Sequence, residues 1–361
     1  MDAFIKNLRI KNFKSIKDVE LDCERINLFI GEPNVGKSNV LEAMSLMGAP
    51  YSSLDRKFMG EFIRYEDATD LFHFDNITEP IEVTSNIGSA FLRNIPNMSS
   101  YDLILGDKNI AKEAAEVWRS EAFQDLITKQ DLRKNTIKIP YFYCGFQADG
   151  HKGGSSYING TSSPIKKYTF IPYEKRHGEF FQLFLSPPYG VNLYTIVEKN
   201  NELKSKYGKE FKKYGLDLLM DIRGKKFEIQ RRDEDLSYKI PYSSMADTLQ
   251  RYIFYMAAIE SNKDSIILLE EIESHSFPRY VQELAQKMID TKDNQFFVTT
   301  HSPYLLNTVM SEKSDVAIFL ATYEDFQTKI TRLNDEEISE LLNHGLDVFY
   351  NLKGLAHEQE S

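Results

Sequence analysis

The sequence predicts an α/β fold built around a mainly parallel sheet. Three short apolar runs, typical of strands buried on both faces, occur at Ile26–Ile30, Ile266–Leu269 and Phe296–Val298. Each run ends in glycine or polar residues, and apolar residues at helical spacing follow. With 361 residues, of which 42% are hydrophobic, the chain has enough apolar material for one large domain or two ordinary ones.

The composition of the chain argues against several classes of protein function. The formal charge of −10 disfavours a surface that coats nucleic acid throughout, although a local basic patch stays open. Cys23 and Cys144 lie far apart and lack metal-spaced partners, so we expect neither a disulfide framework nor a zinc site. No apolar run is long enough for a signal peptide or a membrane span. We therefore expect a cytoplasmic protein with no membrane contact.

The first apolar run leads directly into a glycine-rich loop, Gly31–Ser38, which fits the pattern G-x-x-x-x-G-K-[ST]. In this pattern backbone N–H groups surround phosphate oxygens, the lysine reaches the terminal phosphates and the serine holds Mg²⁺. The apolar spacing downstream predicts a helix whose N-terminus faces the phosphates. The predicted nucleotide-binding residues are Gly31, Glu32, Pro33, Asn34, Val35, Gly36, Lys37, Ser38 and Asn39.

The middle of the chain carries weaker patterns. Short alternating runs such as Ile81–Val83, together with a helix around Trp118, predict the antiparallel part of an N-terminal lobe. The Gly/Ser-rich stretch Gly145–Ser163 predicts an exposed loop or hairpin. Residues 191–214 form a charged, helix-compatible segment, and 199–232 is rich in lysine and arginine. That basic stretch is either a nucleic-acid contact or a solvated face balanced by carboxylates.

Two carboxylates follow the second apolar run. Because open α/β sheets bind ligands at the carboxyl ends of their strands, we expect Glu270 near Mg²⁺ and Glu271 beside the attacking water. The alternative is an acidic pair that opens the next helix. Ser276 and Pro278 disfavour it, since they resemble the cap and first turn of that helix.

A histidine follows the third apolar run. His301 comes directly after Thr299 and Thr300, at a strand end from which an imidazole can contact a γ-phosphate. In isolation such a histidine is more often a surface or capping residue. Its order, after a phosphate loop and an acidic strand, favours the phosphate contact.

These motifs together resemble a known family. GEPNVGKSN, LLEEIESHSFP and FFVTTHSPYLLN are similar to the Walker A, Walker B with D-loop, and switch-histidine motifs of ABC-type ATPase heads, especially the RecF, SMC and OLD (overcoming lysogenization defect) branch. LRIKNFKSIKDVEL resembles the strand pair that opens these heads. The resemblance implies an α/β P-loop NTPase head with a mixed or antiparallel N-terminal sheet, a mainly parallel core sheet and a short helical insertion. We expect an N-terminal lobe at 1–185, a basic insertion at 186–240 and a C-terminal lobe at 241–361.

The chain departs from the family pattern at two motifs. The acidic strand usually ends Asp-Glu-Pro-Glu, so a glutamate at position 270 is one methylene longer and implies a looser metal site and slower turnover. The signature segment is degenerate: Ser243 and Ser244 either clamp the γ-phosphate of a second copy or cap the helix that follows. The glutamine that senses the metal in this family is either Gln147 or Gln182.

The resemblance implies a Mg²⁺-dependent ATPase. Lys37 would contact the phosphates, Ser38 and Glu270 the metal, Glu271 the water and His301 the transferring group. With one phosphate loop per chain, two copies would sandwich two ATP molecules, which implies a homodimer or higher homo-oligomer through the heads.

The resemblance also bears on partners. OLD-type relatives carry a C-terminal Toprim nuclease, whereas this chain stops soon after His301. We therefore expect a separate effector protein, a nuclease or toxin, as in anti-phage systems of the same branch. The alternatives are a nucleotide-dependent scaffold with little turnover and a RecF-like ATPase of DNA repair or recombination.

Overall fold

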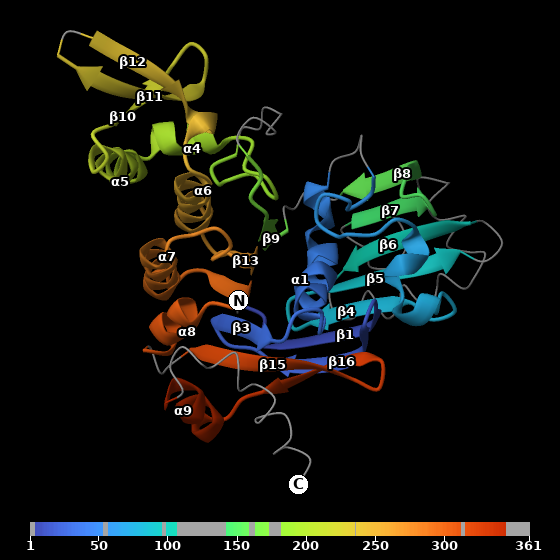
Figure 1. The fold of residues 1–361 in the computed structure, drawn as a ribbon. Helices are drawn as coiled ribbons and strands as arrows, with labels where there is room; N and C mark the ends of the chain where they lie inside the picture. Colours follow the sequence, from blue (N-terminus) through green and yellow to red (C-terminus); the bar gives the residue numbers. More distant parts are fainter. Residues whose placement is uncertain are drawn as a thin grey trace.

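A computed structural model describes residues 4–52, 57–95, 99–106, 142–158, 163–172, 182–234, 236–311 and 315–343. The strands in these ranges form three sheets (Figure 1). The largest two lie on either side of helix α1 (Lys37–Ser45), and the third projects from the far end of the helical side of the molecule (Figure 1).

The core sheet has six strands in the order β16-β15-β3-β14-β13-β9. The strands from β15 to β9 are parallel, and β16 pairs with β15 in the antiparallel direction. The bounds are β3 Ile26–Gly31, β9 Ile165–Tyr168, β13 Ile266–Glu270, β14 Gln295–Thr299, β15 Val316–Glu324 and β16 Gln327–Arg332. The three runs that the sequence marks as buried strands are β3, β13 and β14, so the predicted parallel core is confirmed.

The second sheet is antiparallel, with seven strands in the order β2-β1-β4-β5-β6-β7-β8. Its strands are β1 Asn7–Phe13, β2 Ile16–Asp22, β4 Ile81–Ser85, β5 Ser89–Ile95, β6 Ser100–Gly106, β7 Phe142–Gln147 and β8 Lys152–Ile158. Short 3₁₀ turns lie at Leu46–Tyr51, Ala68–Leu71 and His73–Asp75. The predicted opening strand pair, the antiparallel lobe and the hairpin after Gly145 are confirmed, whereas the helix expected around Trp118 lies outside the described residues.

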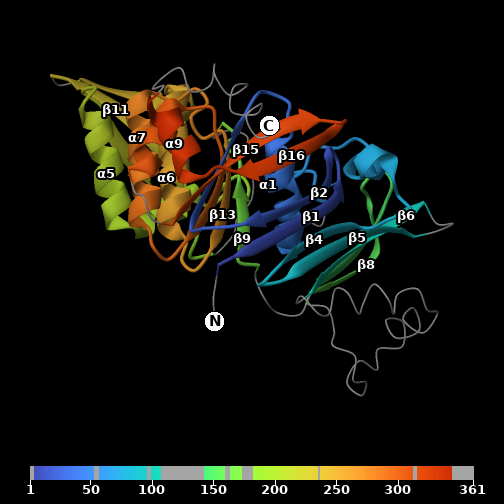
Figure 2. The same cartoon turned by 90° about the horizontal axis from the view of Figure 1, so that it is seen from below.

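Two hydrophobic cores lie on opposite faces of the core sheet. Helix α1 and the antiparallel sheet cover one face, with side chains such as Phe29, Leu268 and Phe297 between them. The other face is covered by α6 (Asp247–Ser261), α7 (Pro278–Asp290) and α8 (Pro303–Met310) (Figure 1), and Figure 2 shows α6 and α7 on this side from below. Because both faces are covered, β3, β13 and β14 need apolar side chains in both directions, and the sequence supplies them.

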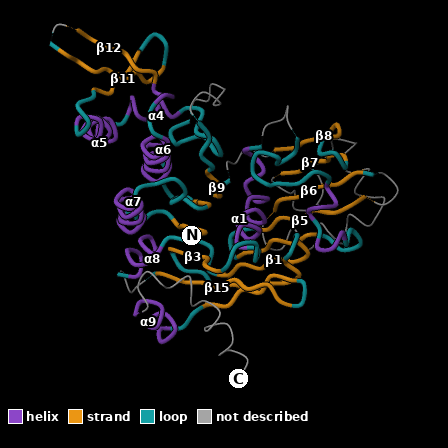
Figure 3. The backbone as a smooth tube through the Cα atoms, viewed as in Figure 1, coloured by secondary structure: helices purple, strands orange, loops and turns teal. Residues whose placement is uncertain are grey.

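The insertion contains more β-structure than expected. Two helices, α4 (Leu193–Lys199) and α5 (Asn201–Lys212), are separated at Asn200, whose side chain accepts hydrogen bonds from the first amides of α5. They are followed by a three-stranded antiparallel sheet of β10 (Asp217–Asp221), β11 (Lys226–Asp233) and β12 (Leu236–Pro241) (Figure 3). The sequence analysis predicted only a partly helical insertion here.

Two further differences concern the start of one helix and a pair of strands late in the chain. Phe277, not Ser276, is the N-cap of α7, although Pro278 begins that helix as predicted. Strands β15 and β16 were not anticipated, and the acidic stretch after them forms α9 (Asp335–Asn343). Within the described residues, no helix is both long and apolar enough to span a membrane.

Candidate nucleotide site

The order of the core strands brings three remote motifs to one edge. Strand β14 lies between β3 and β13, and all three run in the same direction, so their carboxyl ends are adjacent. The glycine-rich loop follows β3, the acidic pair follows β13 and the switch histidine follows β14. Glu270 is in register with Thr299, which in turn is in register with Phe29. Carboxyl ends of parallel strands are where open α/β sheets bind ligands.

The glycine-rich loop has the backbone of a phosphate cradle. Asn34 and Gly36 have φ angles of 64° and 97°, and α1 begins at the next residue, Lys37. The Lys37 ammonium lies inside the loop, where it donates to the carbonyl oxygens of Gly31 at 3.0 Å and Glu32 at 2.7 Å. Burial lowers the pKa of Lys37, while Glu271 and Glu273 oppose this effect. The loop therefore has a helix N-terminus, turned amides and one enclosed cation.

A hydrogen-bond chain from two other elements anchors this loop. The Thr328 hydroxyl donates to the Val35 carbonyl at 2.8 Å and lies 2.6 Å from the Ser15 hydroxyl. The Ser15 hydroxyl in turn accepts a hydrogen bond from the side-chain amide of Asn39. Since the Thr328 hydrogen is used on Val35, Ser15 must donate to Thr328. The sequence analysis missed Ser15 and Thr328. Ser15 lies within the opening strand-pair segment, where only the strands were predicted, Thr328 belongs to no motif, and both contacts are long-range.

The predicted metal residues contact one another. The Ser38 hydroxyl, at the start of α1, lies close enough to the Glu270 carboxylate at the end of β13 to lower the pKa of that carboxylate. Glu270 also pairs with Arg64 at 2.9 Å and Lys167 at 3.3 Å. Burial alone would raise the pKa of Glu270, but Lys167, Ser38 and Arg64 outweigh it and hold the pKa below its ordinary value. The longer glutamate side chain is thus held from three sides.

Hydroxyl and carboxylate oxygens are suitable Mg²⁺ ligands, so Ser38 and Glu270 fit a hard divalent cation. Among the residues that the structure describes, no group of three or more His, Cys, Asp or Glu side chains could hold a metal alone.

Glu42 is a second buried carboxylate beside this pair. It lies one helical turn after Ser38 on α1, its side chain is 1% exposed, and it pairs with Lys14 and with Arg64 at 2.8 Å. Arg64 therefore bridges Glu42 and Glu270. A glutamate within the otherwise apolar face of a helix is the sequence signal that could have identified Glu42.

The predicted water-activating residue and the switch histidine also meet. The carboxylate of Glu271 lies 3.6 Å from the imidazole of His301, and their side chains are 45% and 34% exposed. Burial and the charge of Lys37 lower the pKa of His301, and Glu271 partly offsets this. Glu271 has a φ of 44° and donates its backbone amide to the Thr299 carbonyl at 3.0 Å. The two side chains reach the same region as Lys37.

The signature-like serines do not cap the following helix. Ser243 and Ser244 end a short 3₁₀ turn, Tyr242–Ser244, whereas the N-cap of α6 is Ala246, which makes no side-chain cap hydrogen bond. The cap alternative for these serines is therefore wrong. Ser244 is exposed near the start of α6.

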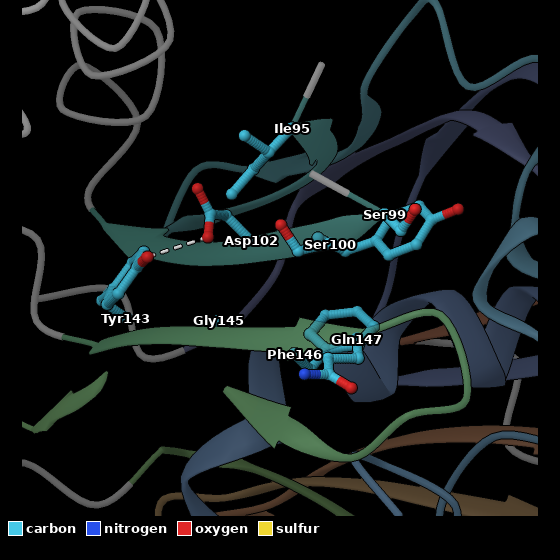
Figure 4. A pocket seen from close by; sticks show the side chains of 9 residues that line it. Ile95, Ser99, Ser100, Asp102, Tyr143, Gly145, Phe146 and Gln147 are labelled. Carbon is cyan, nitrogen blue, oxygen red and sulfur yellow. Dashed lines mark hydrogen bonds between the residues drawn. The ribbon is translucent and has the colours of Figure 1, made fainter. Parts of the chain in front are cut away.

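The two candidate glutamines lie elsewhere. Gln147 ends β7 and lines a hollow of about 390 Å³ on the antiparallel sheet (Figure 4). Gln182 accepts a hydrogen bond from Ser186 at 3.4 Å. The side chain of β9 that reaches Glu270 is instead Lys167, which also donates to the Phe62 carbonyl.

The same hollow contains a buried carboxylate, Asp102, which accepts from Tyr143 at 2.8 Å and pairs with Arg93 at 3.4 Å. Burial raises the pKa of Asp102, and Tyr143 and Arg93 oppose this. Its partners come from the adjoining strands β5 and β7, so these three side chains link β5, β6 and β7.

Several basic side chains in the insertion are paired with carboxylates. Lys212 lies 2.7 Å from Asp217, and Arg232 lies 3.9 Å from the same carboxylate. Further pairs join Lys206 to Glu260, Lys213 to Glu210 and Lys226 to Glu228. These pairs support a solvated, charge-balanced face over a nucleic-acid contact.

Comparison with known families gives two matches. The profile described as "AAA ATPase domain" matches residues 4–214, more than half of the chain. A second profile, described as "AAA domain, putative AbiEii toxin, Type IV TA system", matches residues 151–307.

Two curated relatives are similar in sequence. An "ATP/GTP phosphatase" of Helicobacter pylori is 24% identical over 343 residues, which cover 86% of this chain and 89% of that protein. A "Retron Vc95 probable ATPase" of Vibrio cholerae is 36% identical over 72 residues, 19% of this chain and 14% of that protein.

Solved structures of SMC heads are also similar. An SmcHead bound to the C-winged helix domain of ScpA has a TM-score of 0.49 at 15% identity and covers 93% of this chain and 99% of its own. The SMC head domain from Thermotoga maritima has a TM-score of 0.40 at 10% identity, and the match covers 91% of this chain and 99% of that domain.

Proposed function

Since the chain belongs to the AAA ATPase domain family and has the P-loop NTPase fold of an ABC-type head, we propose that it is a Mg²⁺-dependent ATPase whose heads dimerise around ATP and gate an effector carried on a separate chain. The observation that carries the proposal is the convergence of the Lys37 loop, the acidic end of β13 and His301 at one sheet edge. Each of these groups has a distinct task in phosphoryl transfer.

In the proposed reaction, the loop amides and Lys37 bind the β- and γ-phosphates. Binding requires the Lys37 ammonium to exchange its contacts with the Gly31 and Glu32 carbonyls for phosphate oxygens. Ser38 and Glu270 would hold Mg²⁺, which supplies neutralisation of the phosphate charge when bound. The depressed pKa of Glu270 keeps this carboxylate ionised at neutral pH, as a metal ligand must be.

Glu271 would orient the attacking water and accept its proton. It is more exposed than Glu270, and its oxygen lies 3.6 Å from the His301 ring nitrogen. Because the pKa of His301 is lowered, the imidazole is neutral at physiological pH and can donate one hydrogen bond to a γ-phosphate without adding a charge.

The test of this assignment is Glu271→Gln. The variant retains a side chain of the same shape but cannot accept the proton, so we expect ATP hydrolysis to fall by about 100-fold or more while nucleotide affinity is retained. ATP should then accumulate on the protein and prolong the dimer, which light scattering after size-exclusion chromatography would detect. Lys37→Ala is the paired control, because it should abolish nucleotide retention. Undiminished hydrolysis by Glu271→Gln would remove Glu271 from its assigned role.

Gating of a separate effector is supported by the local 36% identity to the Vibrio cholerae retron ATPase. If the heads gate a partner, that partner should distinguish closed heads from open ones. Copurification from native cells with Glu271→Gln and with Lys37→Ala should therefore recover different amounts of it. Equal recovery of every copurifying protein would argue against nucleotide-dependent gating.

A further inference from the structure

We propose that Glu273 is a positioning residue of this site, and that its carboxylate ties the loop carrying Glu271 to the loop carrying His301. The inference rests on the ATPase function proposed above. Glu273 belongs to the loop between β13 and α7, and His301 to the loop between β14 and α8. The two loops are adjacent because β13 and β14 are neighbours in the core sheet.

One oxygen of Glu273 makes both contacts. Its Oε1 accepts a hydrogen bond from the Thr300 hydroxyl at 2.8 Å and another from the His301 backbone amide at 2.5 Å. The Thr300 hydroxyl also accepts from the Ser302 amide at 2.9 Å, and Ser302 caps α8 through the Leu305 amide. The carboxylate thus fixes the main chain on both sides of the histidine.

The second oxygen of Glu273 has no hydrogen-bond partner in the described part of the chain, although it is buried. A buried carboxylate oxygen without a donor is costly, and native proteins seldom keep one without a local reason. Burial raises the pKa of Glu273, and hydrogen bonds from the backbone amides of His301 and of Glu273 itself and from the Thr300 hydroxyl oppose this. A smaller or apolar residue would avoid the cost but would leave the histidine loop without its acceptor.

This link between the two loops matters because the side chains of Glu271 and His301 are only partly buried. Glu271 and His301 are 45% and 34% exposed, so their own packing does not fix their separation. Two links between the loops contribute to it: the hydrogen bond from the Glu271 backbone amide to the Thr299 carbonyl, and the Glu273 carboxylate, which accepts from the His301 backbone amide. A misplacement of about 1 Å at such a site can reduce the rate about 100-fold.

The experiment compares Glu273→Ala with Glu273→Gln. Alanine removes the acceptor, so kcat should fall about 10–100-fold, while the Kd for nucleotide should change less than about twofold because Lys37 and the loop amides keep their positions. Glutamine keeps one acceptor oxygen for Thr300 and His301, so it should restore kcat to within about threefold of wild type. Hydrogen exchange of the His301 amide should accelerate in the alanine variant and return to the wild-type rate in the glutamine variant.

Two outcomes would overturn the proposal: alanine retaining wild-type kcat and His301 protection, or alanine weakening nucleotide binding as much as it lowers kcat. If the alanine variant does not fold, Thr300→Val provides the second test. It removes one of the two donors, so we expect a several-fold fall in kcat at unchanged nucleotide Kd, and an unchanged kcat would overturn the proposal. A wild-type chain that binds but does not hydrolyse ATP would instead contradict the ATPase function, and the exchange measurement would still test the tie.

Discussion

At the residue scale, the glycines of the phosphate loop are required by space as well as by backbone angle. Gly36 has a φ of 97°, and a Cβ at this position would lie 2.0 Å from the Thr328 hydroxyl and 2.6 Å from that of Ser15. A Cβ at Gly31 would lie 2.4 Å from the Ala321 carbonyl oxygen. The motif glycines thus serve the turn and also the close approach of β15 and β16 beneath it.

Gly36→Ala should therefore lose stability and nucleotide binding together. We expect a loss of about 1–3 kcal/mol in the free energy of unfolding, because the angle is strained and Thr328 must move. Urea unfolding and a nucleotide-binding titration would measure both effects. Gly208→Ala is the matched control: Gly208 lies within α5 with open space around its Cα, so alanine should stabilise by about 0.5–1 kcal/mol. Equal effects at the two sites would contradict this account.

Lys166 predicts a pH dependence of stability. It is 5% exposed, donates to Asn262 and Ser265 at 2.8 Å each, and burial lowers its pKa to about 8. An unfolded lysine titrates near pH ~10.4, so between these values the unfolded chain binds more protons and stability rises with pH. We expect the free energy of unfolding to rise between pH 8 and pH 10, and Lys166→Met to flatten that rise. Lys204→Met, at an exposed position of α5, should leave it unchanged.

The candidate site could be predicted residue by residue where a motif specifies it. Ser38 and Glu270 were expected to share a metal, and the structure places the two side chains together; their role as metal ligands stays a prediction. Arg64, Lys167 and Glu42 were not expected, because their association depends on chain crossings that no local pattern encodes. The additional methylene of Glu270 was expected to loosen the site, but the structure surrounds that carboxylate with three donors, which favours a fixed position.

At the element scale, the strands that are buried on both faces were predicted from the sequence, and the exposed strands were not. Strands β3, β13 and β14 are covered on both faces, so their apolar runs are unambiguous. Strands β10 and β12 are mostly half-buried or exposed, so no run of buried apolar residues marks them in the sequence. The N-cap of α7 was misassigned to Ser276, one residue before the actual cap, and of the two readings of Ser243 and Ser244 the helix cap is wrong, because serine is common in turns as well as at caps.

An element-scale prediction concerns β16, which supports the phosphate loop through one hydroxyl. Thr328→Val removes the hydrogen bond to the Val35 carbonyl and breaks the chain through Ser15 to Asn39. We expect stability to fall by about 1–2 kcal/mol and nucleotide affinity to fall several-fold. Thr331→Val, at an exposed position of the same strand, should have little effect on either quantity. Thermal unfolding and a binding titration would measure both, and unchanged affinity in Thr328→Val would remove β16 from nucleotide binding.

At the scale of the whole molecule, the core sheet separates two groups of elements, one on each of its faces, and each group supports part of the candidate site. The antiparallel sheet and α1 hold the phosphate loop from one face, while α6, α7 and α8 hold the acidic and histidine loops from the other. The signature-like segment that ends at Ser244 directly precedes α6, and Ser244 is exposed. In the proposed sandwich, that segment of one copy closes over the nucleotide of the other, so each site draws on two chains.

A mixing experiment tests that arrangement. The Ser244→Arg variant should bind nucleotide normally but prevent the two heads from closing over it. The Lys37→Ala variant should bind no nucleotide in its own loop. Each variant alone should therefore be inactive. In a mixed dimer, the intact loop of the Ser244→Arg chain faces the intact signature of the Lys37→Ala chain, so one of the two sites is complete. Hydrolysis should therefore reappear on mixing, at no more than about half the wild-type rate per dimer.

The control for that experiment replaces the Lys37→Ala chain with one that carries both substitutions, which leaves no complete site in any pairing. Recovery in the first mixture and none in the second requires that Ser244 of one copy act on nucleotide bound by another. A first mixture that stays inactive, although both chains are folded and the Ser244→Arg chain is loaded with ATP, would exclude the shared site. Hydrolysis by Ser244→Arg alone would show that a single head completes its own site, and the dimer would then have no part in the chemistry.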